Sequence, residues 1–101
     1  MKEENSLSLE TKVSRNPEII HSAMDNEVVM MSVDQGLFFG LDQIGAHIWE
    51  LLETPKTGEE VISLLLPQYD VTREKCESDT LRFLNKMLDK KIILIQSNQP
   101  G

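Results

Sequence analysis

The N-terminal part of the chain carries short apolar runs that are typical of β-strands. Near-alternation of apolar and polar positions predicts a first strand over residues 8–15, and Val28–Val33 and Leu37–Leu41 are strongly β-type runs. A further short extended piece is expected within residues 19–24. The connection Asp34–Gly36 is three residues long with glycine last, as in many hairpins. We therefore expect the two runs that flank it to pair antiparallel.

In the second half of the chain the apolar spacing becomes helical. Asp42 is a good N-cap for a helix over Gln43–Glu53. The apolar face of this helix is expected to contain Ile44, Ile48, Leu51 and Leu52. Thr57 and Glu60 have the spacing of a capping box, and they predict a second helix that ends near Leu66, just before a proline.

The third and longest helix is expected from its N-cap, Thr72, to about Lys90, and Ile92–Ile95 is a final β-type run. This order predicts an α+β fold that is winged helix-turn-helix-like, with an N-terminal three-stranded antiparallel sheet followed by three helices. One domain is expected over residues 8–95, between flexible ends at residues 1–7 and 96–101.

Charge is distributed unevenly along the 101 residues, which carry a net charge of -7. Residues 1–70 contain four basic and thirteen acidic side chains, whereas residues 73–91 have a net charge of +2. Nucleic-acid binding depends on Lys and Arg side chains that neutralise phosphates, so most of this chain is unsuited to it. The acidic part would attract a cationic peptide, or it simply keeps a small domain soluble.

Signals for membrane insertion and secretion are absent from the sequence. The longest apolar run, Val61–Leu66, is far shorter than the roughly 20 residues that span a bilayer. The acidic start, Met1–Ser6, lacks the apolar segment of a secretory signal. Cys76, the single cysteine, cannot form an internal disulfide. We therefore expect a cytoplasmic protein with no membrane partner.

The residues that could carry chemistry are few. Cys76, His21 and His47 are the only Cys and His residues, and their spacing matches no zinc-site signature. Cys76 could pair with a histidine as nucleophile and base, which leaves a Cys76-dependent peptidase as an alternative. However, Cys76 falls on the apolar stripe of the third helix, where a cysteine is usually an inert small hydrophobe. We predict no metal, no cofactor and no enzymatic activity.

The Leu37–Leu41 run has apolar residues on both predicted faces. A period of two places Leu37, Phe39 and Leu41 on one face, and Phe38 and Gly40 on the other. The third helix carries a wide apolar stripe, in which Leu81, Leu84 and Leu88 lie beside Cys76, Thr80, Phe83 and Met87. This surplus either closes a small core from two sides or forms a groove for β-augmentation, in which an extended peptide pairs with the strand and packs on the helix.

The same segment carries a family resemblance. The pattern combines a strand with a glycine and two aromatics, then Gly-x-x-Ile-Trp-x-Leu-Leu, a Thr-x-x-Glu helix start, a Tyr-Asp-Val connection and a late Phe-Leu pair. The matching residues here are Gly36, Phe38, Phe39, Leu41, Gly45, Ile48, Trp49, Leu51, Leu52, Thr57, Glu60, Tyr69, Asp70, Val71, Phe83 and Leu84. In these residues the chain resembles the PqqD family over about residues 8–95. It departs from the pattern at Asp42, where the family usually has Asn, and at Lys91, where a Gly often precedes the last strand.

The resemblance implies a stand-alone RiPP recognition element, a domain that binds the leader segment of ribosomally synthesised, post-translationally modified peptides. Acidic members of this type occur in lasso-peptide clusters. The implied partners are the leader of the precursor peptide, a leader peptidase and an ATP-dependent macrolactam cyclase, with no nucleic acid. A PqqD-like chaperone for a radical-enzyme pathway and a winged-helix DNA-binding regulator are the alternatives.

In the implied binding mode, the leader adds as a strand beside residues 37–41 and packs on the third helix. The residues expected to contact it are Leu37, Phe38, Phe39, Gly40, Leu41, Cys76, Asp79, Thr80, Phe83 and Met87. Either Phe38 or Phe39 is expected to face the ligand, and the pattern does not choose between them. The helix that follows Asp42 is expected to serve as scaffold.

Overall fold

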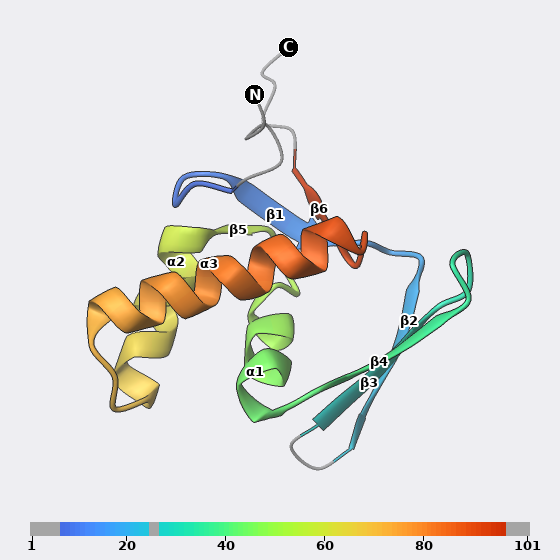
Figure 1. Ribbon diagram of the computed structural model, residues 1–101, viewed down its shortest axis with the longest axis horizontal. Helices are drawn as coiled ribbons and strands as arrows, with labels where there is room; N and C mark the ends of the chain where they lie inside the picture. Colours follow the sequence, from blue (N-terminus) through green and yellow to red (C-terminus); the bar gives the residue numbers. More distant parts are fainter. Residues whose placement is uncertain (1–6, 25–26, 97–101) are drawn as a thin grey trace.

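Within the residues that the structure describes, the chain forms two small sheets and three α-helices (Figure 1). The structure is a computed structural model, and it describes residues 7–24 and 27–96. Its elements in chain order are β1 (Lys12–Arg15), β2 (Ile19–Met24), β3 (Glu27–Ser32), β4 (Leu37–Leu41), α1 (Gln43–Leu51), β5 (Lys56–Thr57), α2 (Gly58–Leu65), a 3₁₀ turn η2 (Leu66–Gln68), α3 (Arg73–Asp89) and β6 (Ile93–Ile95). The predicted α+β class is confirmed.

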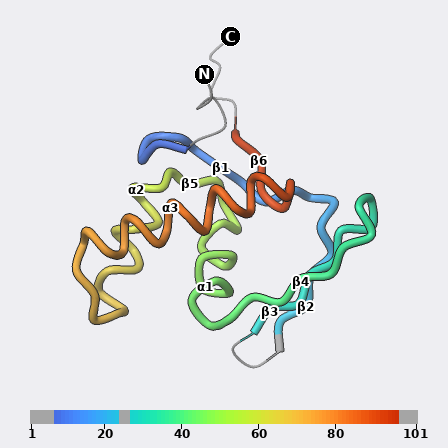
Figure 2. Tube along the Cα trace, in the orientation of Figure 1, coloured from blue at the N-terminus to red at the C-terminus, as the bar shows by residue number. Residues whose placement is uncertain are grey.

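Strands β2, β3 and β4 form an antiparallel sheet with β3 in the middle. Gly36, in the turn between β3 and β4, has φ of 67°, a left-handed conformation that glycine adopts without strain. Because β3 is central, β4 has a sheet partner on one edge only among residues 7–24 and 27–96. Figure 2 shows this sheet extending to one side of the helices, with β4 leading directly into α1. The predicted three-stranded sheet and the pairing of β3 with β4 are confirmed.

The strand that completes this sheet is β2, whereas the strand predicted over residues 8–15 is shorter and lies elsewhere. Residues 8–11 form a turn closed by a hydrogen bond from the Thr11 amide to the Ser8 carbonyl, at 3.2 Å. The Leu9 carbonyl accepts from the Glu59 amide at the start of α2, at 3.0 Å, so it is not available to a strand partner. β1 therefore begins at Lys12, and it pairs antiparallel with β5 and β6 in the second sheet.

Leu7 and Gln96, which flank the predicted domain, both make contacts with it. Leu7 is buried in the core, and its amide donates to Asn85 Oδ1 at 3.1 Å. The Gln96 amide donates to the Lys12 carbonyl at 2.8 Å, which continues the pairing of β6 with β1. The expectation of flexible ends otherwise concerns residues 1–6 and 97–101, which lie outside the described residues.

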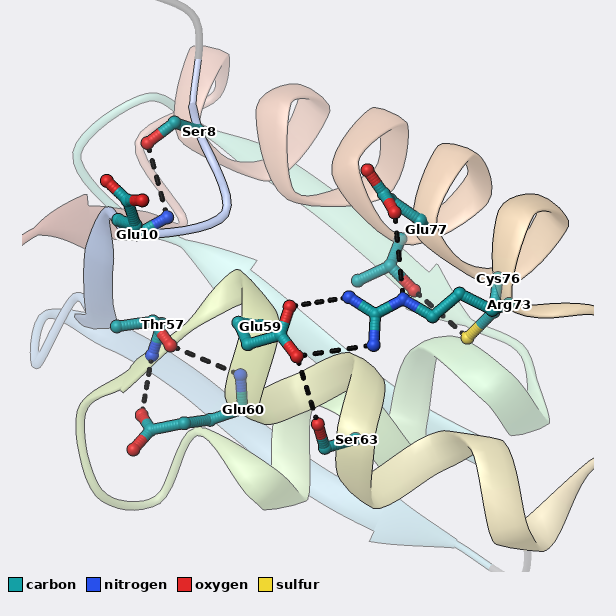
Figure 3. A network of polar contacts seen from close by, with 10 residues as sticks. Ser8, Glu10, Thr57, Glu59, Glu60, Ser63, Arg73, Cys76 and Glu77 are labelled. Atoms are coloured by element: carbon teal, nitrogen blue, oxygen red, sulfur yellow. Dashed lines mark hydrogen bonds and ion pairs between the residues drawn. The ribbon is translucent and has the colours of Figure 1, made fainter.

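Each α-helix begins at the capping residue that the sequence predicts. The Asp42 carboxylate and the Thr72 hydroxyl each accept from the amide three residues on, at 2.9 and 3.1 Å. At α2, Thr57 and Glu60 make both hydrogen bonds of a capping box, at 3.1 and 2.8 Å (Figure 3). α1 ends at Leu51, two residues earlier than predicted, and the other two helices end within one residue of the expected position.

The core lies between the helices and the inner sides of the two sheets. Its fully buried side chains include Val13, Met30, Ile48, Val61, Ile62, Leu84, Ile92 and Ile93. Trp49 of α1 is also buried, and Arg15 of β1 lies over its ring with the guanidinium 4.5 Å from the ring centroid. Arg15 Nε and Nη2 donate to the Trp49 carbonyl at 3.0 and 2.7 Å, so this side chain joins β1 to the end of α1.

We expect Thr57→Ala to lower the free energy of unfolding by about 1 kcal/mol, because it removes the hydroxyl that caps α2. Urea unfolding followed by far-UV circular dichroism measures the change. Thr54→Ala is the matched control, since it removes only an exposed contact with the Lys56 ammonium, and it should cost less than about 0.5 kcal/mol. Equal effects of the two substitutions would contradict the role assigned to the capping box.

Candidate functional site

A surface groove lies between β4 and α3. Its larger part has a volume of about 560 Å³ and is lined by Phe38, Phe39, Gly40, Leu41, Asp42, Phe83, Lys86, Met87 and Lys90. A smaller part of about 190 Å³ is lined by Asp42, Ile44, Gly45, Ile48, Asp79, Thr80 and Phe83. The two parts share Asp42 and Phe83, so they adjoin, and we refer to them together as the β4–α3 groove.

The strand side of this groove follows from the pleat of β4. Leu37, Phe39 and Leu41 point towards the helices: Leu41 is buried and Phe39 is partly buried against the core. Phe39 also lies under the Lys90 ammonium, which is 5.7 Å from the ring centroid. Of the two aromatics that the sequence left unresolved, Phe39 is therefore the one that faces α3.

Phe38 belongs to the opposite face of the sheet, although it also borders the groove. It is 70% exposed, and strand pairing aligns it with Met31 and Ile20, which are exposed as well. The three side chains form an apolar row across the outer face of β2, β3 and β4.

The helix side is built from residues one turn apart on α3. Thr80 and Met87 are buried, and Phe83 between them is partly buried. The Phe83 ring lies 3.2 Å from the position that a Cβ on Gly45 would occupy, so the missing side chain lets α3 approach α1 closely. Cys76 is buried one turn earlier, with Thr80 Oγ1 as its polar neighbour at 3.9 Å.

Eight of the ten residues predicted to form the site line the groove. These are Phe38, Phe39, Gly40, Leu41, Asp79, Thr80, Phe83 and Met87. Leu37 and Cys76 line neither part: Leu37 is at the open start of β4, and Cys76 is beneath the surface. The structure thus brings the predicted strand and helix together as two walls.

Six further residues line the groove that were not predicted from the sequence, namely Asp42, Ile44, Gly45, Ile48, Lys86 and Lys90. Ile44 was placed on the core face of α1, but it is 48% exposed and lines the groove, whereas Gly45 and Ala46 in the same turn are buried. Lys86 and Lys90 follow Phe83 and Met87 by three positions each, and this helical spacing could have placed them on the same wall.

Several charged side chains on the exposed side of α3 form ion pairs. Asp79 contacts the ammonium of Lys75 at 3.1 Å and the guanidinium of Arg82 at 3.3 Å. The hydrogen bond with Lys75 is the main reason that the pKa of Asp79 is below its usual value. Arg73 pairs with Glu59 of α2 and with Glu77 (Figure 3). The Arg73 hydrogen bond likewise lowers the pKa of Glu59.

The described residues contain no group of His, Cys, Asp and Glu side chains that could hold a metal ion. His47 Nδ1 lies 3.1 Å from the Tyr69 hydroxyl, and His21 meets the edge of the Trp49 ring, at 5.3 Å between centroids. Neither imidazole is hydrogen-bonded to the Cys76 thiol within residues 7–24 and 27–96. In the same part of the chain, no helix is long and apolar enough to cross a membrane.

The fold is that of a small α+β, winged helix-turn-helix-like domain. Its candidate site is a surface groove between a sheet edge and the longest described helix. The chain belongs to the PqqD family, because the family model described as Coenzyme PQQ synthesis protein D (PqqD) matches residues 27–93. The family predicted from the sequence is confirmed.

Two solved structures resemble the chain. It is similar to TbiB1 in complex with the TbiA(beta) leader peptide, with 30% sequence identity and a TM-score of 0.77 over 84% of this chain and 99% of that one. It shares the fold of lasso peptide synthetase B1 complexed with the leader peptide, with 22% identity and a TM-score of 0.72 over 81% of this chain and 96% of that one. A comparison with curated proteins gives no significant match.

We expect the Cys76 thiol to react with a thiol reagent such as DTNB on the order of a hundredfold more slowly in the native protein than in urea, because it is buried. The rate of thionitrobenzoate release measures this ratio. A native thiol that reacts as fast as the unfolded one would contradict a packing role for Cys76 and would revive the nucleophile hypothesis.

Proposed function

We propose that this protein is a RiPP recognition element that binds the leader segment of a precursor peptide in lasso-peptide biosynthesis. The observation that carries the proposal is the β4–α3 groove, where a strand edge that has no partner among the described residues lies beside apolar side chains of α3. Its support is the fold, which is similar to that of TbiB1 in complex with a leader peptide.

In the proposed binding mode, the leader becomes a further strand of the β2–β3–β4 sheet. The backbone of Leu37–Leu41 would supply hydrogen bonds that do not depend on the leader's sequence. Alternate leader side chains would point into the groove and pack between Phe39 on the strand and Phe83 and Met87 on the helix. Sequence selectivity would therefore come from the shape and charge of the helix wall.

The proposed contact set keeps the ten residues expected from the sequence. Their roles differ according to whether the side chain lines the groove or is buried beneath it. Leu37 would contribute backbone at the start of β4, and Asp79 and Thr80 would line the end of the groove near α1. Cys76 would support this wall from below, because it is buried under Thr80. Ile44 joins the set, since its exposed side chain lines the same end.

We further propose that the protein presents the bound leader to a leader peptidase and to an ATP-dependent macrolactam cyclase, and that it is not itself an enzyme. The buried thiol of Cys76 and the lack of a hydrogen-bonded imidazole beside it within the described residues support a binding role. A single free cysteine also fits action in a reducing cytoplasm.

The second candidate is a PqqD-like peptide chaperone in a radical-enzyme pathway, which the description of the matching family model favours. The two candidates share the groove and differ in the enzymes that receive the peptide. A short precursor reading frame beside peptidase and cyclase genes would support the lasso assignment. A neighbouring radical-enzyme gene would support the alternative.

Fluorescence anisotropy with the labelled leader of the precursor encoded beside this gene tests the proposal. We expect saturable binding by the wild type and at least about tenfold weaker binding by Phe83→Ala, because this ring forms the centre of the helix wall. Leu64→Ala is the matched control: Leu64 is an exposed apolar residue on α2 that lines neither part of the groove.

Circular dichroism of each variant separates lost binding from lost folding. Unchanged affinity in a folded Phe83→Ala variant would exclude the groove as the binding site. Salt-dependent binding to duplex DNA without affinity for the leader would replace the proposal with the winged-helix DNA-binding alternative.

A further inference from the structure

The end of the β4–α3 groove near the start of β4 is positively charged. Lys86 and Lys90 line the groove there, one turn apart on α3. Two contacts fix the position of Lys90: its ammonium is 5.7 Å from the Phe39 ring centroid, and Gln35 Nε2 donates to its carbonyl at 2.8 Å. Neither lysine forms an ion pair with another residue in the described ranges. Both charges are therefore available to a ligand.

Two acidic side chains, Asp42 and Asp79, line the opposite end of the groove. Asp42 accepts the amide of Gly45 as the N-cap of α1. Asp79 is held between Lys75 and Arg82, which neutralise it. β4 and α3 run in opposite directions, so the groove passes from the lysine end beside Phe39 to the capped end beside Gly45. The lysine end therefore carries a local excess of positive charge and the other end keeps the negative charge of Asp42, while the whole chain has a net charge of -7.

The net charge of the chain alone would suggest a cationic peptide ligand, whereas the two lysines in the groove favour an acidic one. A peptide would be drawn towards the acidic surface if it were cationic, but long-range attraction is screened beyond about 10 Å at moderate salt. Inside the groove, selectivity depends on charges at contact distance, and a leader side chain bound there would lie close to the two ammonium groups. Aspartate or glutamate is the complementary chemistry.

We infer that the leader segment recognised by this protein carries an acidic side chain next to its apolar anchor residues, and that Lys86 and Lys90 select for it. The inference rests on the proposed function and specifies its ligand. If the added strand runs antiparallel to β4, the acidic residue follows the apolar anchors in the leader sequence, because the strand then leaves the groove at the lysine end.

The test uses the full chain and the labelled leader of the precursor encoded beside its gene. The variant Lys86→Gln with Lys90→Gln removes both charges without introducing repulsion, and it should weaken binding roughly three- to tenfold at low salt. The difference should shrink as sodium chloride is raised to about 0.5 M. Lys12→Gln with Lys56→Gln is the matched control, because it changes the net charge equally at β1 and β5, outside the groove.

Charge reversal gives the sharper result. Lys86→Glu with Lys90→Glu should bind the natural leader more weakly than the glutamine variant does, and it should recover affinity for a leader in which the acidic residues are replaced by lysine. Circular dichroism confirms that each variant is folded.

The outcomes separate this inference from the proposed function. Equal affinity of wild type and Lys86→Gln/Lys90→Gln, with Phe83→Ala still weakened, would overturn the charge selection and leave leader binding intact. A leader that binds in the groove without any acidic residue would do the same. A leader that does not bind the wild type at all would overturn both.

Discussion

The outer edge of β4, which has no strand partner in the part of the chain that the structure describes, is the feature on which the rest of the molecule depends. An edge strand presents backbone N–H and C=O groups that recruit other strands, including those of another copy of the same protein. Here the edge is only five residues long, and two lysines lie beside it on α3. Like charges disfavour pairing between copies, whereas a peptide with suitable side chains gains both the backbone pairing and the apolar wall.

The width of the groove is set by covalent and steric constraints. β4 passes into α1 without a loop, because Asp42 ends the strand and caps the helix. Gly45 in the first turn then allows the Phe83 ring to approach within 3.2 Å of its missing Cβ position. At the other end of α3, Arg73 pairs with Glu59 and holds the helix to α2. Together these contacts fix both walls before any ligand is present, which reduces the entropy cost of binding.

The sequence predicts the parts of this fold that depend on local chemistry. The three N-caps, the capping box and the turn at Gly36 are recognisable because each depends on residues close together in the chain. The assignment of strands to sheets depends on distant partners, and here the prediction was incomplete. β5 is two residues long and has no alternation to detect, and the start of β1 is displaced because the Leu9 carbonyl bonds to α2.

The candidate site was predictable to a similar degree. Apolar periodicity identified the strand wall and Phe83 with Met87, because a surplus of apolar residues is visible in the sequence. It could not orient Phe38 and Phe39, since both faces of β4 are apolar and register decides which one meets α3. Ile44 was assigned to the core because periodicity alone does not distinguish an apolar side chain that packs in the core from one that lines a surface groove.

Amide hydrogen exchange, with and without the leader of the precursor encoded beside the gene, tests most directly whether the leader docks at the edge of β4. We expect slower exchange at Leu37–Leu41 when the leader is bound, because the edge amides of β4 gain hydrogen-bond partners. Strand β2, at the other edge of the same sheet, should keep its exchange rates. Leader binding that protects β2, or that leaves β4 unprotected, would contradict the claim that β4 is the docking edge.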